Sequence, residues 1–326
     1  MTYVRATLFT LLACILLARP AIAQATKPVF HFQDGDGYRD LLYGDTPVWR
    51  DMIKYDPADR ENTYKPYKHI FGFNGEGFIT KGPGGLYPHH RGIFFGFKAF
   101  DSDEAKTLLG DFWHCPEAAG ITQQHVKFLP ERELADADQA REAQVVDWVC
   151  KDGKPVVRDT REFTIRRISD KKYNIDCAIT VETLTGRAIT LGGDAHHAGL
   201  HFRAAQEVAD AKDPKKKGGS AVYIRPPTAK LTKDDIYADC PWVHCSFDIK
   251  GHHYQLTHLD GPGNPTPTTY STRPYGRVGA FFTAQTTPEH PLYVQYRLIL
   301  EEGNPPSPDE LAARYLAYSK EHKPLP

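Results

Sequence analysis

The sequence predicts an all-β fold, an antiparallel β-sandwich formed by a single domain with a C-terminal helix. Three observations support this class. The 326 residues include 26 glycines and 25 prolines, 12% of the residues are aromatic, and several segments alternate apolar and polar residues. Many turn-forming residues together with a period of two favour short strands over a helical bundle. Sandwiches of this length are often single domains.

Residues 1–23 have the pattern of a cleavable export signal. Arg5 supplies a positive charge, an apolar stretch follows, and an A-x-A motif ends at Ala23, just before Gln24. The apolar stretch is shorter than the roughly 20 residues that span a bilayer. The sequence therefore predicts a signal peptide at 1–23 and a domain at 24–326. We expect a periplasmic or secreted location without a transmembrane segment.

Strand-like segments follow along the domain. Alternating patterns typical of half-buried strands occur at 27–33, 161–168, 173–184 and 292–300. Residues 92–97 (GIFFGF) are apolar on both faces, as in a fully buried strand. Residues 129–144 (LPERELADADQAREAQ) are polar nearly all round, and we expect an exposed loop or an irregular helix there.

The C-terminal segment has the signals of a capped helix. Ser307 is an N-cap residue, Pro308 takes the first helical position, and Glu310 completes a capping box. Leu311, Tyr315 and Tyr318 then form an apolar stripe. We expect this stripe to dock on the body of the domain.

Charge and cysteine content limit the function classes. The 40 Lys+Arg and 41 Asp+Glu residues nearly cancel, which gives no electrostatic case for binding nucleic acid. Five cysteines follow the predicted cleavage site, so they cannot all pair within one chain. A Cys240–Cys245 disulfide and buried, reduced thiols are the two alternatives.

Two histidine-rich motifs are the candidate functional site. In HHAGLHFRA (196–204), strict alternation predicts a half-buried strand whose open face carries His197, His201 and Arg203. At roughly 3.3 Å per residue, His197 and His201 stand about 13 Å apart, too far to share one metal ion on a straight strand. This spacing favours a groove for an extended ligand.

The second motif is LYPHHRGIFFGF (86–97). In an extended chain, His89 and Arg91 would share one face and His90 would point the other way. Pro88 and Gly92 favour a bend that brings them together.

The predicted site residues are histidine, arginine and aromatic side chains from several motifs. The catalytic candidates are His90, Arg91, His197, His201, Arg203 and Tyr275. The substrate-binding candidates are His69, His89, Trp113, His114, Trp242, His258 and Arg273.

Four motifs, YPHHRGIFFGF, DFWHC, GDAHHAGLHFRA and STRPYGRVGAFF, resemble the bacterial PmoA-type family in order and spacing over residues 45–302. The resemblance implies a β-sandwich-like domain, common in bacteria rich in sugar-degrading systems. It carries over no established catalytic residue.

Three functions stay open on the sequence. The first is an exported carbohydrate-active enzyme that acts on an oligosaccharide or modified sugar through His/Arg/Tyr acid–base chemistry, as a lyase, an epimerase or a glycosidase. Elimination or epimerisation suits these residues better than hydrolysis by two carboxylates. The second is an oxygenase-like or hydrolytic enzyme that holds divalent copper, zinc or iron, for example through His90, His114 and His197. The third is a non-catalytic glycan-binding module.

Overall fold

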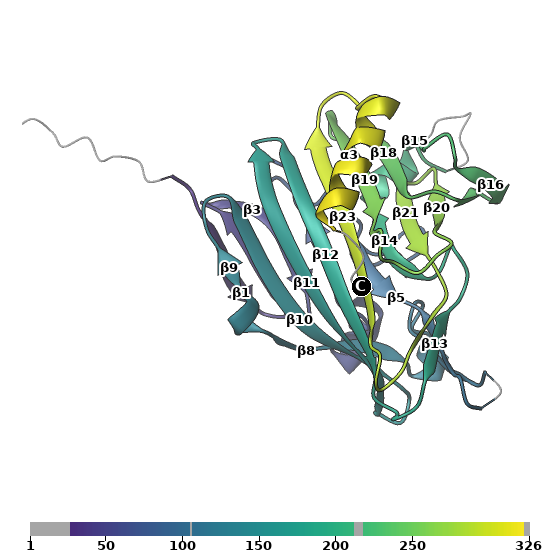
Figure 1. Ribbon diagram of the computed structural model, residues 1–326. Coiled ribbons are helices and arrows are strands. Elements are labelled where there is room, and N and C mark those ends of the chain that lie inside the picture. Colours follow the sequence, from purple (N-terminus) through teal and green to yellow (C-terminus); the bar gives the residue numbers. More distant parts are fainter. Residues whose placement is uncertain (1–26, 105, 212–217, 323–326) are drawn as a thin grey trace, which may run out of the picture.

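The computed structural model describes residues 27–104, 106–211 and 218–322, and these form two large antiparallel sheets and one small sheet. The predicted antiparallel β-sandwich with a C-terminal helix is confirmed (Figure 1). The predicted signal peptide, residues 1–23, lies outside the described residues and stays a prediction. Within the described ranges, none of the helices combines the length and the apolar character needed to cross a bilayer.

The strands of each sheet are given in spatial order. The ten-stranded sheet contains β1 (Phe30–Gly35), β2 (Tyr38–Tyr43), β3 (Thr46–Met52), β4 (Tyr67–Ile70), β5 (Ile93–Gly96), β14 (Gly199–Arg203), β21 (Arg277–Phe281), β20 (Thr269–Arg273), β17 (Ile236–Ala238) and β16 (Lys230–Lys233). The nine-stranded sheet contains β15 (Val222–Ile224), β18 (Trp242–Ile249), β19 (His252–Asp260), β23 (Leu292–Glu302), β12 (Lys172–Thr183), β11 (Pro155–Ser169), β10 (Gln139–Val149) and β8 (Thr122–Phe128), with β9 (Leu134–Ala135) paired to β10. The small sheet contains β22 (Ala284–Thr286), β13 (Ile189–Gly192), β6 (Lys98–Asp101) and β7 (Leu108–Asp111).

The helices are short except for the last one. They are η1 (Pro57–Asp59), α1 (Arg60–Thr63), η2 (Glu117–Ala119), η3 (Pro130–Arg132), α2 (Gln206–Asp210) and α3 (Pro308–Glu321). The capping box of α3 is confirmed, because Ser307 Oγ accepts from the backbone N of Glu310 while Glu310 Oε2 accepts from the backbone N of Ser307. Leu311 and Tyr318 are buried against the nine-stranded sheet, where α3 lies beside β19 and β23 (Figure 1).

Alternation along the long strands places one face of the nine-stranded sheet in the core. In β12 every second residue from Tyr173 to Val181 is buried, and the predicted strands at 161–168, 173–184 and 292–300 are confirmed. The apolar residues of β5 are buried on both faces, as expected for 92–97. The five described cysteines are free thiols, so Cys240 and Cys245 are not joined.

The expectation of a loop or irregular helix at 129–144 is wrong, because this segment forms η3, β9 and the start of β10. The polar pattern of this segment is misleading because one of its acidic residues, Glu142, points into the core. Glu142 is buried, and its Oε1 accepts from Lys68 Nζ at 2.5 Å, while Asp51 Oδ2 lies at the same distance from this ammonium group. Burial opposes charge on Lys68, but the two carboxylates outweigh it and raise the pKa of the ammonium group.

The prediction of a half-buried strand at 196–204 is also wrong. The strand β14 covers Gly199–Arg203 only, and all five residues are buried. Strands β5 and β21 pair with its two edges, and Trp113 packs on the face that carries His201. His197 lies before the strand, in a turn, so it does not share an open face with His201. The separation of about 13 Å expected for His197 and His201 on one straight strand therefore does not apply.

The buried ion triad of Lys68, Asp51 and Glu142 yields a stability prediction. Lys68→Met should lower the free energy of unfolding by about 3–5 kcal/mol, because the buried Asp51 carboxylate loses its counter-charge and Glu142 loses its hydrogen-bond donor. Lys54→Met is the matched control, since its ammonium group is half exposed and stands 3.8–4.0 Å from its acidic partners. We expect the control to change stability by less than about 0.5 kcal/mol in denaturant unfolding. Equal losses in both variants would contradict this account of the triad.

Candidate functional site

The two adjacent histidines of the first motif lie in a tight turn before β5. The backbone N of His90 donates to Tyr87 O at 3.0 Å, which closes the turn. Gly92 follows with φ of 28°, and a Cβ at this position would lie 2.1 Å from Lys68 O. The bend that the sequence predicts is confirmed, and it allows His89 and His90 to face one site.

Two Asp-x-x-His turns carry two further histidines. Asp111 Oδ1 accepts from the backbone N of His114 at 3.0 Å, and Asp111 Oδ2 lies 2.9 Å from His114 Nδ1. In the second turn, Asp194 O accepts from the backbone N of His197 at 2.9 Å, and Asp194 Oδ1 lies 3.1 Å from His197 Nδ1. Each carboxylate orients its imidazole through Nδ1 and leaves Nε2 free to bind another group.

The small sheet brings these two turns to the same edge. Strands β7 and β13 flank β6 and both run antiparallel to it, so they run parallel to each other. Lys98 of β6 pairs with Asp111 on one side and with Gly192 on the other. Because strands of one direction end at one edge, the turns at 111–114 and 194–197 leave the sheet side by side.

These turns assemble a cluster of four imidazole rings. Ligand nitrogens of His89, His90 and His197 all lie within 4.8 Å of one another. The ring of His114 has its centroid 4.9 Å from that of His89 and 4.7 Å from that of His197. We call His89, His90, His114 and His197 the histidine cluster. Nitrogens bound to one zinc ion at 2.0–2.1 Å stand about 3.4 Å apart in a tetrahedron, so small side-chain rotations would close this set on an ion.

Several nitrogens of the cluster lack partners although they are buried. His90 is 1% exposed, and among the described residues neither of its ring nitrogens has a hydrogen-bond partner. The same holds for Nε2 of His89. A buried polar atom without a partner costs about 1–3 kcal/mol, so such atoms are normally matched by a protein group, water or an ion. Unmatched nitrogens on adjacent rings are therefore a property of a ligand-binding site.

The surroundings of His89, His90 and His197 keep these three rings neutral. Burial lowers the pKa of His89 to about 3, and nearby positive groups add to the effect. Burial also lowers the pKa of His90 and of His197, although Asp194 opposes the shift of His197. These rings are neutral near pH 7, which is the form that coordinates metal ions.

The two carboxylates behind the cluster stay ionised. Burial alone would raise the pKa of Asp111, but hydrogen bonds from His114 outweigh it and the pKa is lowered. Burial also opposes charge on Asp194, and there hydrogen bonds from the His196 backbone and the His197 ring lower the pKa. Carboxylate–histidine pairs of this kind commonly stand behind metal-bound imidazoles.

Two other predicted site residues lie on the outer side of the cluster. Tyr275 comes from the turn between β20 and β21, and its ring centroid is 6.1 Å from that of His90 at an interplanar angle of 23°. Burial raises the pKa of Tyr275, so the phenol is protonated at neutral pH. Arg273 Nη2 donates to His196 Nε2 at 2.8 Å. Arg273 and Tyr275 also line a pocket of about 620 Å³ beside the cluster.

Two predicted arginines bind backbone carbonyl groups inside the fold. Arg91 is fully buried, lies 4.0 Å from the ring of Tyr64 and donates to the carbonyl groups of Asn62 and Pro88. Arg203 is fully buried and donates to Ala204 O at 2.9 Å and to the backbone carbonyl of Tyr275. These contacts hold backbone in place, so neither guanidinium group is presented to solvent.

Three predicted histidines are also buried, and each has a partner at one ring nitrogen, while His201 Nδ1 and His258 Nε2 have none among the described residues. His201 Nε2 donates to Ala198 O at 2.9 Å. His69 Nδ1 lies 3.0 Å from Thr80 Oγ1, and His258 Nδ1 lies 2.8 Å from the hydroxyl of Tyr270. Burial lowers the pKa of His69 and of His258 to about 3, so both are neutral.

The two predicted tryptophan platforms are covered by protein. Trp113 is 0% exposed and packs between Phe94 and His201, beneath the histidine cluster. Trp242 packs in a separate core under α3 with Leu311. Neither ring offers an open face to a ligand in this structure.

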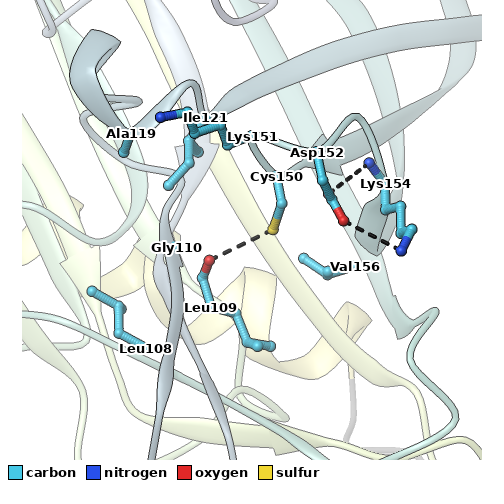
Figure 2. A pocket seen from close by; sticks show the side chains of 10 residues that line it. All are labelled: Leu108, Leu109, Gly110, Ala119, Ile121, Cys150, Lys151, Asp152, Lys154 and Val156. Atoms are coloured by element: carbon cyan, nitrogen blue, oxygen red, sulfur yellow. Dashed lines mark hydrogen bonds and ion pairs between the residues drawn. The ribbon is translucent and has the colours of Figure 1, made fainter.

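A different pocket, of about 490 Å³, lies at the edge of the small sheet near the hairpin between β10 and β11 (Figure 2). Its polar groups are satisfied locally, because Cys150 Sγ contacts Leu109 O at 3.5 Å and Asp152 accepts from the backbone N of Lys154. None of the predicted site residues lines it. This pocket is therefore separate from the predicted site.

The groups that support the cluster were not among the predicted site residues, although Asp111 and Asp194 are evident in the sequence as carboxylates close to the histidine motifs. Asp111 and Asp194 orient their histidines, Tyr87 stands 5.6 Å from His90 between ring centroids, and Arg277 Nη1 donates to His196 O. The repeated D-x-x-H spacing, DFWH and DAHH, is the local signal that identifies the two aspartates. Tyr87 has no such signal, because its role arises from contacts distant in the chain.

The cluster defines a candidate three-histidine metal centre, in which Asp194 orients the ligand His197 and Asp111 orients the adjacent His114. The chain belongs to the family described as a family of unknown function, DUF6807, which matches residues 39–316. The expected membership of the PmoA-type family is therefore wrong. No curated protein matches the sequence.

Solved structures resemble the chain only distantly. They include a GalM/aldose epimerase homologue from C. elegans (6% identity, TM-score 0.36, covering 85% of this chain and 100% of that one) and the heparan sulfate lyase HepC from Pedobacter heparinus (10%, 0.30, 86% and 37%). This chain spans only 36–40% of the length of several larger enzymes among them. The names of these structures refer to carbohydrate enzymes. Because the TM-scores lie below 0.5, the likeness says nothing about this chain's site or reaction.

The turn that carries His89 and His90 yields a prediction about Gly92. Gly92→Ala should lower the free energy of unfolding by at least about 3 kcal/mol, because the new Cβ meets backbone at 2.1 Å. Gly84→Ala is the matched control: φ there is 77°, but nothing lies within 4 Å of its Cβ position. The control should lose only the roughly 1 kcal/mol of left-handed strain. Denaturant unfolding that shows equal losses would contradict the close approach at Gly92.

Proposed function

We propose that the protein is a metal-dependent enzyme in which His89, His90 and His197 hold one divalent transition-metal ion. The observation that carries the proposal is the approach of their three ligand nitrogens to within 4.8 Å of one another. Neutral imidazole suits zinc, copper and iron. Three protein ligands leave a fourth position for water or substrate, which is typical of catalytic rather than structural zinc sites.

The groups around this set favour Lewis-acid chemistry, and zinc is the metal we expect. The three ligands include neither the carboxylate of non-haem iron centres nor the thiolate of blue-copper centres. A bound zinc ion lowers the pKa of its water to about 7. His114 would be the general base for such a water molecule, because its ring adjoins that of His89 and Asp111 orients it through Nδ1. The reaction class is therefore metal-assisted hydrolysis.

The second candidate is proton transfer on a sugar without metal, the acid–base chemistry predicted first from the sequence. One observation favours it: the Asp111–His114 and Asp194–His197 pairs both leave Nε2 free, and Tyr275 lies beside the same cluster. A base paired with a protonated phenol suits epimerisation or elimination. Metal content discriminates between the two candidates.

The metal proposal predicts the metal content of protein purified without a histidine tag. After dialysis against zinc, elemental analysis should find about one equivalent in the wild type. His90→Ala and His197→Ala should each hold less than about a tenth of an equivalent, because two imidazoles bind zinc weakly. His253→Ala is the control, since His253 also pairs with an aspartate, Asp248, but stands exposed. A wild type without zinc, or cluster variants that retain a full equivalent, would end this proposal.

The carboxylate behind His197 yields a second prediction. Asp194→Asn should weaken zinc binding about 10–100-fold in competition with a chelator, since it removes the charge that orients the ring. Asp152→Asn is the control, because Asp152 accepts from a backbone N two residues on, as Asp194 does, but lies in the other pocket. Equal zinc affinity in both variants and the wild type would show that Asp194 does not support the metal site.

A further inference from the structure

The pocket beside the histidine cluster has the size of a sugar-binding subsite. Its volume is about 620 Å³, and its walls include Leu86, Tyr87, Asp234, Asp235, Arg273 and Tyr275. Ligand pockets of about 300–1,000 Å³ accommodate small organic molecules, and a monosaccharide or disaccharide falls in this class. The pocket is therefore large enough for a sugar ring.

Two tyrosines join this pocket to the proposed metal site. The ring centroid of Tyr87 lies 5.2 Å from that of Tyr275 and 5.6 Å from that of His90. Tyr275 in turn lies 6.1 Å from His90. A ligand that rests on the tyrosines would thus be separated from the metal ligands by about one ring layer.

The backbone of Tyr87 at the pocket is strained. Its φ is 55°, whereas the other two lining residues with positive φ, Asp234 (46°) and Asp235 (61°), form the two-residue turn of the β16–β17 hairpin, where such values are usual. The left-handed region is costly for a bulky residue such as tyrosine. Strain of this kind concentrates at ligand sites, where the surrounding structure holds residues in an otherwise unfavourable position.

The charges of the pocket favour a neutral ligand. The guanidinium group of Arg273 is already engaged, because it donates to His196 Nε2 and to Asp234 O and lies 3.7 Å from Asp235 Oδ2. The lining therefore carries two carboxylates against one engaged cation. Carboxylates accept hydrogen bonds from hydroxyl groups, and their charge opposes binding of an acidic sugar.

We propose that this pocket binds an uncharged, polyhydroxylated pyranose ring, with Tyr87 as its stacking face and Asp234 and Asp235 as acceptors for its hydroxyl groups. The inference rests on the proposed function, because it names the substrate class that would reach the metal. Tyr87 is 44% exposed, so its ring is open to a ligand. A sugar face stacked on an amphipathic tyrosine ring keeps its hydroxyl groups free for the carboxylates.

The test is binding of defined methyl glycosides, measured by saturation-transfer NMR in the presence of chelator. The probes are methyl β-D-glucopyranoside, methyl β-D-galactopyranoside and D-glucuronate. At least one neutral glycoside should bind, and glucuronate should bind at least tenfold more weakly. Tyr87→Asn should weaken neutral binding at least tenfold, and asparagine tolerates the left-handed backbone. Tyr293→Ala is the control, an equally exposed tyrosine on β23, and should leave binding unchanged.

Failure of this inference differs from failure of the metal proposal. Sugar binding is measured without metal, and zinc binding is measured without sugar. No binding of either neutral glycoside, equal binding by Tyr87→Asn and wild type, or binding of glucuronate as strong as that of the neutral probes would overturn the subsite. A protein that binds sugar but no zinc would retain the subsite and lose the metal centre.

Discussion

Four imidazole rings packed into one largely buried space are the constraint on which the rest of this account depends. Burial favours the neutral form of His89, His90 and His197, and around His90 it also removes the water that would satisfy the ring nitrogens. Asp111 and Asp194 each satisfy one nitrogen of His114 and His197, but both nitrogens of His90 stay without a partner among the described residues. A metal ion bound at the remaining nitrogens would offset part of that cost. The cluster is therefore better explained as a ligand set than as core packing.

The scaffold holds this set because its turns are anchored on rigid strands. Lys68 belongs to β4 and pairs with Ile93 of β5, directly after the turn that carries His89 and His90. In the ion triad, Asp51 of the neighbouring strand β3 and Glu142 of β10, which belongs to the other sheet, both hold Lys68 of β4. The small sheet aligns the two Asp-x-x-His turns at one edge. Loops positioned by packed strands are the usual place for reactive groups.

Periodicity along the sequence was sufficient to predict the sandwich, the strands β11, β12 and β23, and the capped helix α3. It failed at 129–144, where Glu142 points inward because its charge is matched by Lys68, a contact 74 residues away. It failed again at 196–204, where alternation suggested an open face but Trp113, which is distant in the chain, packs on His201 and closes that face. Local patterns report a preference for one face, and they do not report what covers the other.

The site was predicted only in part, because its residues meet through contacts between segments that are distant in the chain. The combination of His90, His114 and His197 appeared among the metal alternatives, and the structure places these rings in one cluster. Arg91 and Arg203 were expected at the same place, but their guanidinium groups donate to backbone carbonyls inside the fold.

The most direct test of the three-histidine metal centre is X-ray absorption at the zinc edge of zinc-loaded protein. The account predicts a nitrogen or oxygen shell at about 2.0–2.1 Å with outer scattering from about three imidazole rings. A shell without imidazole scattering, or one with sulfur at about 2.3 Å, would contradict it.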